Sequence, residues 1–167
     1  MNRIFGLGEI LLLLVGSVLL QVTSANYFPA GLYFDLPLVL TLFIGWYSPP
    51  AKGALWGTLF GLLQDVSQMA PYWGLNGLSK TLIGFGSSQL RKWFLLGGFS
   101  GWFAVILVAS LFDGCLVNGW LSLAGERIPP SYWSDTALRS LITASGGASM
   151  IRFYHRFKFP QKDFRRF

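Results

Sequence analysis

Residues 53–90 read GALWGTLFGLLQDVSQMAPYWGLNGLSKTLIGFGSSQL, two apolar runs joined by one short turn. Each run, 53–70 and 74–90, approaches the roughly 20 residues with which a helix crosses a bilayer. The turn between them, from Pro71 to Trp73, combines a helix breaker with aromatic residues that favour the membrane–water interface. This segment therefore predicts a transmembrane helical hairpin.

The rest of the chain has the same character as the hairpin. Further apolar runs cover approximately residues 4–25, 32–48, 95–124 and 134–151. The 167 residues are 53% hydrophobic and 12% charged, whereas a soluble domain carries about 25% charged residues. We therefore expect an all-α polytopic membrane protein of about six transmembrane helices, forming one domain over residues 1–151.

The first apolar run has a second interpretation, because Arg3 and the residues that follow it could pass as a cleavable signal peptide. The run is longer than the usual apolar core of about 7–15 residues, and it contains Glu9. These features favour a retained first helix.

The basic residues predict an orientation. With both termini cytoplasmic, nearly all Lys and Arg residues outside the spans lie on the inner side, and Arg127 lies on the outer side. Residues 152–167 are then a basic cytoplasmic tail that contacts anionic lipid, so the net charge of +6 does not imply a nucleic-acid partner. The tail's basic residues are Arg152, Arg156, Lys158, Lys162, Arg165 and Arg166.

Six ionisable residues fall inside the predicted spans, where each costs about 2.5–3.5 kcal/mol at a helix centre unless it is paired or hydrated. They are Glu9, Asp35, Asp65, Lys80, Asp113 and Arg139. Their depths along the helices predict two ion pairs, Asp65 with Lys80 and Asp113 with Arg139. Most of them lie in the outer half of the membrane. Two interpretations remain open: internal ion pairs that fix the order of the helices, or an outward-facing polar cavity.

Small residues mark one face of the third span, at Gly53, Gly57 and Gly61. Such spacing lets a neighbouring helix backbone approach closely. We favour packing within the domain over docking of a partner's helix.

The residues offer little for catalysis. The single histidine, His155, lies in the tail, and the single cysteine, Cys115, excludes a multi-cysteine metal site. An aspartyl-protease pair of Asp65 and Asp113 is disfavoured, since each has a basic residue at matching depth. The chain also lacks a phosphate-binding GxxxxGK[ST] loop. We therefore expect a protein that is not an enzyme and that carries no metal or cofactor.

A specific motif lies in the hairpin, where the first helix ends in Gly61-Leu62-Leu63-Gln64-Asp65 and the second opens with Gly74-Leu75-Asn76-Gly77-Leu78-Ser79-Lys80. This pattern resembles the rod shape-determining protein MreD family. The likeness is sharp over the hairpin and extends over the rest of the chain in hydropathy and helix number. The residues that carry it are Gln64, Asp65, Gly74, Asn76, Gly77 and Lys80.

The resemblance implies a non-enzymatic protein of the bacterial inner membrane that serves the elongasome, the machinery of lateral peptidoglycan synthesis and cell shape. The implied partner is MreC, and through it MreB, the glycosyltransferase RodA and a class B penicillin-binding protein. We expect the motif to order the third and fourth helices, with a consequence for MreC docking.

The resemblance also suggests an alternative, because the family's fold is similar to the substrate-binding S-components of energy-coupling-factor transporters. Such a protein would capture a vitamin or micronutrient in an outward-facing cavity. S-components dock on their coupler through an alanine-x-x-x-alanine face of the first helix. This chain has Gly6, Gly8, Gly16 and Ser17 there instead, which weakens the transporter interpretation.

Overall fold

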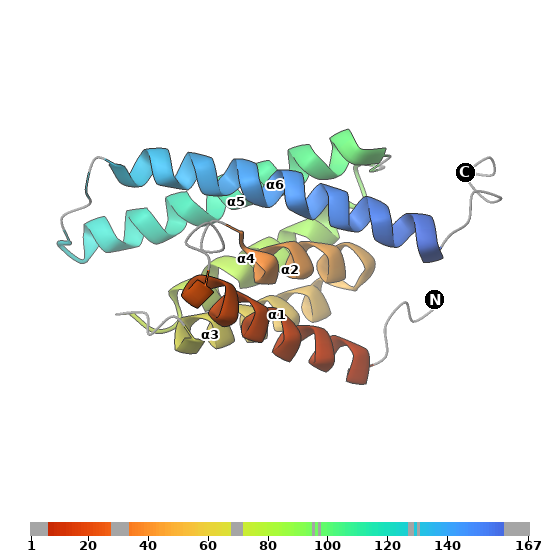
Figure 1. The fold of residues 1–167 in the computed structure, drawn as a ribbon, viewed down its shortest axis with the longest axis horizontal. Coiled ribbons are helices and arrows are strands. Elements are labelled where there is room, and N and C mark those ends of the chain that lie inside the picture. The colour runs from red at the N-terminus through yellow and green to blue at the C-terminus, as the bar shows by residue number, and fades with distance from the viewer. Residues whose placement is uncertain are drawn as a thin grey trace.

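The computed structural model describes residues 7–27, 34–67, 72–94, 96, 98–126, 129 and 131–158 of the chain. These residues form six α-helices, each overlapping one predicted span (Figure 1). The helices are α1 (Leu7–Tyr27), α2 (Leu36–Tyr47), α3 (Pro50–Ser67), α4 (Leu75–Leu90), α5 (Gly98–Leu123) and α6 (Ser131–Lys158). The expected all-α fold is confirmed over this part of the chain.

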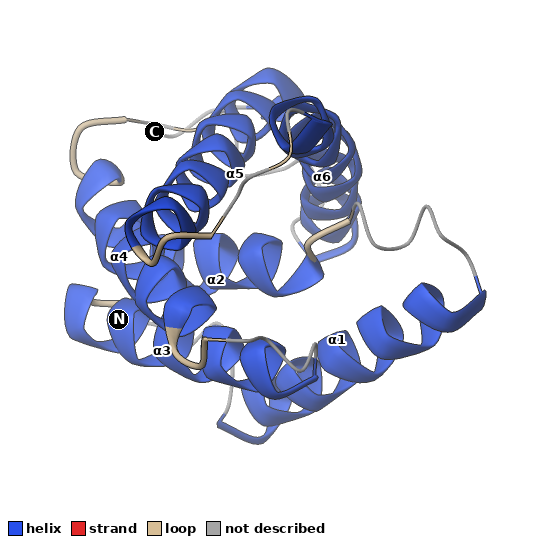
Figure 2. Ribbon diagram, turned by 90° about the vertical axis from the view of Figure 1, so that its left-hand side faces the viewer, coloured by secondary structure: helices blue, strands red, loops and turns tan. Residues whose placement is uncertain are grey.

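The helices run close to the long axis of the molecule, and the start of α1 and the end of α6 lie at the same end (Figure 1). The most extensive packing joins α3 to α4 and α5 to α6. Viewed along the bundle, α5 and α6 form one layer, α2 and α4 lie beneath them, and α1 and α3 form the opposite layer (Figure 2). Helix α2 contacts all five other helices.

Helix α2 is the core of the bundle. Every residue from Pro37 to Trp46 is buried, so this helix has no exposed polar stripe. Its 12 residues extend about 18 Å at 1.5 Å per residue, less than the roughly 30 Å of a bilayer's hydrocarbon core. The described helix is thus shorter than the predicted span 32–48, and its N-cap residue, Asp35, is buried.

The glycines of α3 contact the backbone of α4. A Cβ atom at Gly53, Gly57 or Gly61 would overlap the carbonyl oxygen of Gly84, Lys80 or Asn76, respectively. Glycine at these positions lets the two helix backbones touch. The prediction that this face packs within the domain is confirmed.

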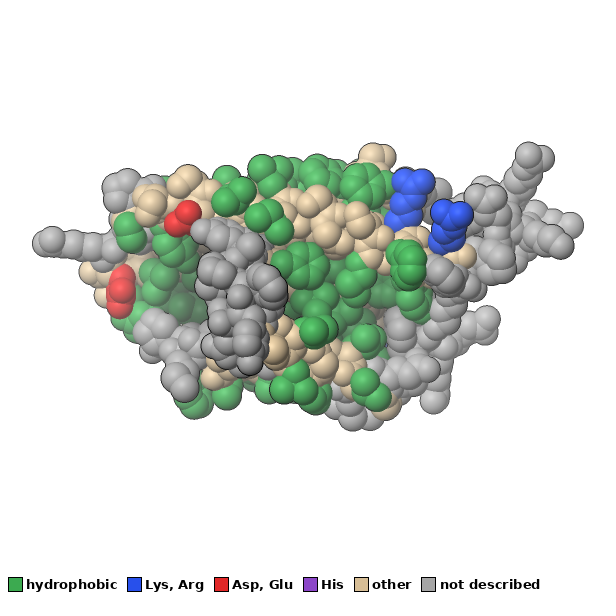
Figure 3. Space-filling view, in the orientation of Figure 1, with side chains coloured by type: hydrophobic (Ala, Val, Ile, Leu, Met, Phe, Trp, Pro, Cys, Tyr) green, Lys and Arg blue, Asp and Glu red, His purple; other side chains and the backbone are tan. Residues whose placement is uncertain are grey.

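The surface is rich in large apolar side chains, which cover much of the face in Figure 3. Within the described residues, α5 is the one helix that is both long and apolar enough to cross a membrane by itself. Helices α2 and α4, with 12 and 16 residues, are shorter than a full crossing. The hydropathy of α3 and α4 is further reduced by Gln64, Asp65 and Lys80, which point inward and are buried.

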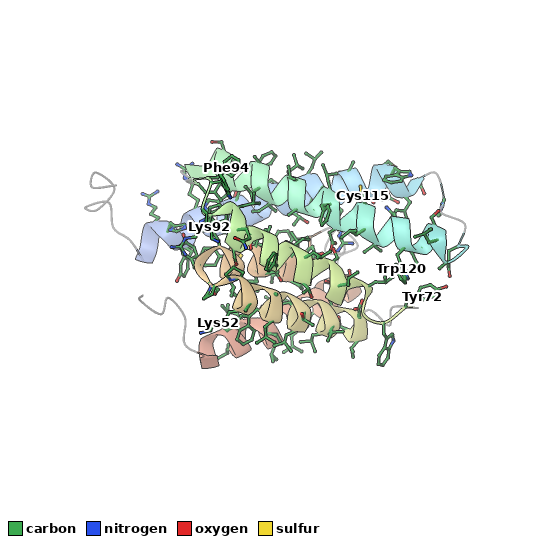
Figure 4. The ribbon with its side chains drawn as sticks, turned by 180° about the vertical axis from the view of Figure 1, so that it is seen from behind. Lys52, Tyr72, Lys92, Phe94, Cys115 and Trp120 are labelled. Carbon is green, nitrogen blue, oxygen red and sulfur yellow. The ribbon has the colours of Figure 1, made fainter. Side chains whose placement is uncertain are left out.

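Exposed charges of opposite sign lie at opposite ends of the bundle. Figure 3 shows basic side chains toward one end and acidic side chains at the other, and Figure 4 places Lys52 and Lys92 far from Tyr72 and Trp120. Among the side chains that the structure describes, the exposed basic residues are Lys52, Arg91, Lys92, Arg152 and Arg156, and the exposed acidic ones are Glu126 and Asp135. The basic residues thus lie at the end that the predicted orientation assigns to the cytoplasm.

Helix α6 continues beyond the predicted domain boundary at residue 151 and ends at Lys158. His155 lies on this extension and packs against the rings of Phe43, Tyr47 and Trp102. Burial lowers the pKa of His155 from its ordinary 6.5, which favours the neutral form at pH 7. The first part of the tail is therefore a packed helical end, and Lys162, Arg165 and Arg166 lie outside the described residues.

The contact of α3 with α4 predicts different effects for two glycine substitutions. Gly57→Ala places a methyl group against the Lys80 carbonyl and is expected to lower the free energy of unfolding by about 1–3 kcal/mol. The matched control is Gly86→Ala on α4, whose added Cβ meets nothing within 4 Å. It should be neutral or stabilising by up to about 1 kcal/mol. Unfolding in detergent, followed by tryptophan fluorescence, measures both, and equal effects would contradict the close contact.

Candidate functional site

Asp35 occupies the N-cap of α2. One carboxylate oxygen, Oδ1, accepts a hydrogen bond from the backbone N–H of Leu38 at 3.0 Å. The sequence Asp35-Leu36-Pro37 favours this start, because aspartate binds the unpaired N–H groups of a first helical turn and proline tolerates that turn. The Asp35 backbone N–H donates to Thr143 Oγ1 of α6 at 3.1 Å. Asp35 is therefore held in place by its own helix and by α6.

The other oxygen of Asp35, Oδ2, binds two cations. Arg139 of α6 donates to it at 2.6 Å, and Lys80 of α4 donates at 3.3 Å. Gln64 Nε2 of α3 lies 3.5 Å away. Asp35 and Lys80 are 1% and 0% exposed, so their interaction is shielded from solvent. This one carboxylate therefore connects α2 with α3, α4 and α6.

Asp113 of α5 completes the arrangement. Its Oδ1 accepts a hydrogen bond from Ser79 at 2.6 Å and lies 3.7 Å from Lys80 Nζ. Asp35, Lys80, Asp113 and Arg139, hereafter the charge cluster, thus contain two carboxylates and two cations from four helices. The formal charges cancel, which lowers the cost of burying each one.

Asp65 serves a different purpose from the charge cluster. Its carboxylate accepts hydrogen bonds from the backbone N–H groups of Gly74, Asn76 and Gly77 at 2.9, 3.3 and 3.2 Å. The Asn76 side chain adds a fourth at 2.8 Å. Helix α4 has Gly74 at its N-cap, and glycine has no side chain with which to cap the helix. Asp65 therefore supplies from α3 the cap that α4 lacks.

The motif glycines have specific roles at this cap. Gly74 has φ +96°, a left-handed conformation that favours glycine. A Cβ at Gly77 would lie 3.1 Å from Leu62 of α3, and one at Gly61 would lie 2.6 Å from the Gly77 Cα. The helix ends thus approach closely enough for Asp65 to reach the N–H groups. Of the motif residues, Asp65, Gly74, Asn76 and Gly77 thus join α3 to the start of α4, whereas Gln64 and Lys80 contact Asp35 of α2.

Both predicted ion pairs are wrong in their partners. Lys80 pairs with Asp35 and Asp113, while Asp65 binds the first turn of α4. Arg139 pairs with Asp35 in place of Asp113. The prediction used depth along the helix axes alone, and depth does not determine which way a side chain points around its helix. The broader expectation of internal ion pairs is confirmed, whereas the Glu9 side chain lies outside the described residues.

A polar cavity of about 120 Å³ adjoins the charge cluster. Asn76 contributes to its wall from α4, Ser110, Asp113 and Gly114 from α5, and Tyr132 and Arg139 from α6. Asn76 and Tyr132 lie in the first turns of their helices, so the cavity faces the end of the bundle opposite the basic residues. The sequence left two interpretations of the buried charges open, internal ion pairs or a polar cavity. Both features are present here, because the ion pairs border a cavity near the predicted outer side.

The hydrogen bonds and ion pairs of Asp35, Asp65 and the charge cluster mainly hold helices in place. Within the described ranges, no cluster of three His, Cys, Asp or Glu side chains is placed to hold a metal ion. Cys115 is exposed on α5 (Figure 4). Comparison with known proteins found no family model, no curated protein and no solved structure that matches this chain.

The balance of charge in the cluster predicts a compensating double substitution. Lys80→Met alone leaves two carboxylates with one cation, and Asp113→Asn alone leaves one carboxylate with two cations. Each should lower the free energy of unfolding by about 3–5 kcal/mol. The double variant keeps the Asp35–Arg139 pair and should lose about 1–3 kcal/mol less than the sum of the two. Unfolding in mixed detergent micelles measures this coupling, and simple additivity would contradict it.

Proposed function

We propose that this chain is a non-enzymatic, multi-pass scaffold of the bacterial elongasome, in the inner membrane with both termini cytoplasmic. It binds MreC and thereby supports lateral peptidoglycan synthesis and cell shape, with indirect links to MreB, RodA and a class B penicillin-binding protein. The observation that carries the proposal is the cap of α4 by Asp65. At this cap, the residues of the motif that resembles the MreD family act through their residue types. Asp65 accepts backbone hydrogen bonds, and Gly74 adopts a left-handed conformation.

Three features support the multi-pass arrangement. Large apolar side chains are exposed on all helices except α2, and such extensive apolar surface is unfavourable in water. The exposed basic residues lie at one end of the bundle and the exposed acidic ones at the other. Most of the charged residues in the middle of the bundle neutralise one another in the charge cluster, as a low-dielectric surrounding requires.

The use of the polar groups supports a scaffold in place of an enzyme. Asp35 and Asp65 each accept several hydrogen bonds from groups that position helices. A nucleophile or general base needs access to its substrate, but both carboxylates are 1% exposed. Rigid helices with apolar outer faces suit the docking of membrane-spanning partners.

The polar cavity is the observation that favours the second candidate, a substrate-binding S-component of an energy-coupling-factor transporter. Its volume of about 120 Å³ is smaller than the roughly 300–1,000 Å³ of pockets that enclose a small molecule. A vitamin would need a wider cavity, so the scaffold is the better-supported function.

Purification of the tagged full-length protein from its native membrane in mild detergent tests the proposal. We expect mass spectrometry of the bound proteins to recover a bitopic coiled-coil protein, MreC, together with cell-wall synthesis enzymes. A tagged multi-pass protein of unrelated function from the same membrane is the control and should recover neither. Recovery of a transmembrane coupler with ATPases, and no MreC, would contradict the scaffold and support the transporter.

A further inference from the structure

The polar cavity has walls that suit a ligand carrying both signs of charge. Asp113 is 4% and Ser110 is 5% exposed, so both polar side chains are held inside the protein while lining the cavity. The described partners of Asp113, Ser79 and Lys80, both contact Oδ1, which leaves Oδ2 as an acceptor. Arg139 is 33% exposed and donates to Asp35 through one nitrogen, out of five N–H donors on a guanidinium.

The charge balance selects the kind of ligand. The charge cluster is neutral with its two carboxylates and two cations, so an added ion would leave one uncompensated charge in a buried place. A zwitterion adds one charge of each sign. Its anionic group fits the guanidinium of Arg139, which suits phosphate or carboxylate, and its ammonium fits the Asp113 carboxylate.

The position of the cavity along the bundle indicates which molecule carries such a zwitterionic group. Asn76 and Tyr132 line it from the first turns of α4 and α6, at the end where Tyr72 and Trp120 lie (Figure 4). Aromatic residues of membrane proteins gather at the level of the lipid headgroups. A ligand at this level lies where a phospholipid presents its phosphate.

We propose that the cavity between α4, α5 and α6 binds a phosphoethanolamine group, with its phosphate on Arg139 and its ammonium on Asp113. The source to which the geometry points is the headgroup of phosphatidylethanolamine in the outer leaflet. This inference rests on the membrane placement proposed above and is independent of MreC binding.

The same contacts discriminate among lipids. The ammonium of phosphatidylethanolamine has N–H donors for Asp113 Oδ2, whereas the trimethylammonium of phosphatidylcholine has none. Phosphatidylglycerol brings a phosphate without a cation and would unbalance the charge cluster. Both lipids should therefore bind less tightly than phosphatidylethanolamine.

Native mass spectrometry of the full chain, delipidated and then incubated with one lipid at a time, tests the proposal. The probes are phosphatidylethanolamine, phosphatidylglycerol and phosphatidylcholine with identical acyl chains, together with soluble glycerophosphoethanolamine, whose phosphodiester and ammonium carry one charge of each sign as the lipid headgroup does. We expect one retained phosphatidylethanolamine and at least tenfold weaker retention of the other lipids. Binding of glycerophosphoethanolamine with no preference among the lipids would contradict a lipid source and identify a soluble ligand of the same chemistry. Equal retention of all three lipids without binding of glycerophosphoethanolamine would overturn the proposal.

Cavity-filling variants locate the binding. Ser110→Leu should lower retention at least tenfold, and Ser145→Leu, at an exposed serine of α6 outside the cavity wall, should leave it unchanged. Ser110→Val is a second, smaller filling at the same position and should lower retention in a protein with normal unfolding. Unchanged retention in folded Ser110→Leu and Ser110→Val would contradict the site. MreC recovery is scored separately, so loss of lipid with retained MreC affects this inference alone.

Discussion

The Asp35 carboxylate is the interaction on which the arrangement of the helices depends. Oδ1 caps α2, and Oδ2 binds Lys80 of α4 and Arg139 of α6. Helix α5 contacts α2 and α4 less extensively than it contacts α6. Both a hydrophobic core and the polar contacts of Asp35 and Asp113 join the α5–α6 pair to α2 and α4. Removing one partner from such a buried cluster leaves an uncompensated charge, which is why the cluster specifies one order of helices.

The buried carboxylates thus perform two separate tasks in the bundle. Asp65 binds backbone N–H groups at the start of α4, and the glycines of α3 let the two helices touch. Asp35 and Asp113 neutralise the cations of α4 and α6. Since these groups face inward, the outer surface stays largely apolar, which supports the proposed placement in a membrane.

The sequence predicts the helices far better than the contacts between them. Apolar runs and prolines are local signals, so all six helices appear near their expected positions. The partners of Lys80 and Arg139 could not be predicted, because depth along a helix leaves its neighbours and its rotation undetermined. Asp35-Leu36-Pro37 is a recognisable start of a helix, but that the same carboxylate also binds two cations depends on α4 and α6. The cavity, lined by three helices, has no local signal.

The most direct measurement of the central role of Asp35 compares Asp35→Asn with Asp135→Asn, an exposed aspartate on α6. Equilibrium unfolding in mixed detergent micelles gives the free energy of each variant. Asp35→Asn is expected to lose about 3–5 kcal/mol, because it leaves Lys80 and Arg139 with Asp113 alone. Asp135→Asn should change stability by at most about 0.5 kcal/mol. Equal and small losses of stability in the two variants would contradict the central role of Asp35.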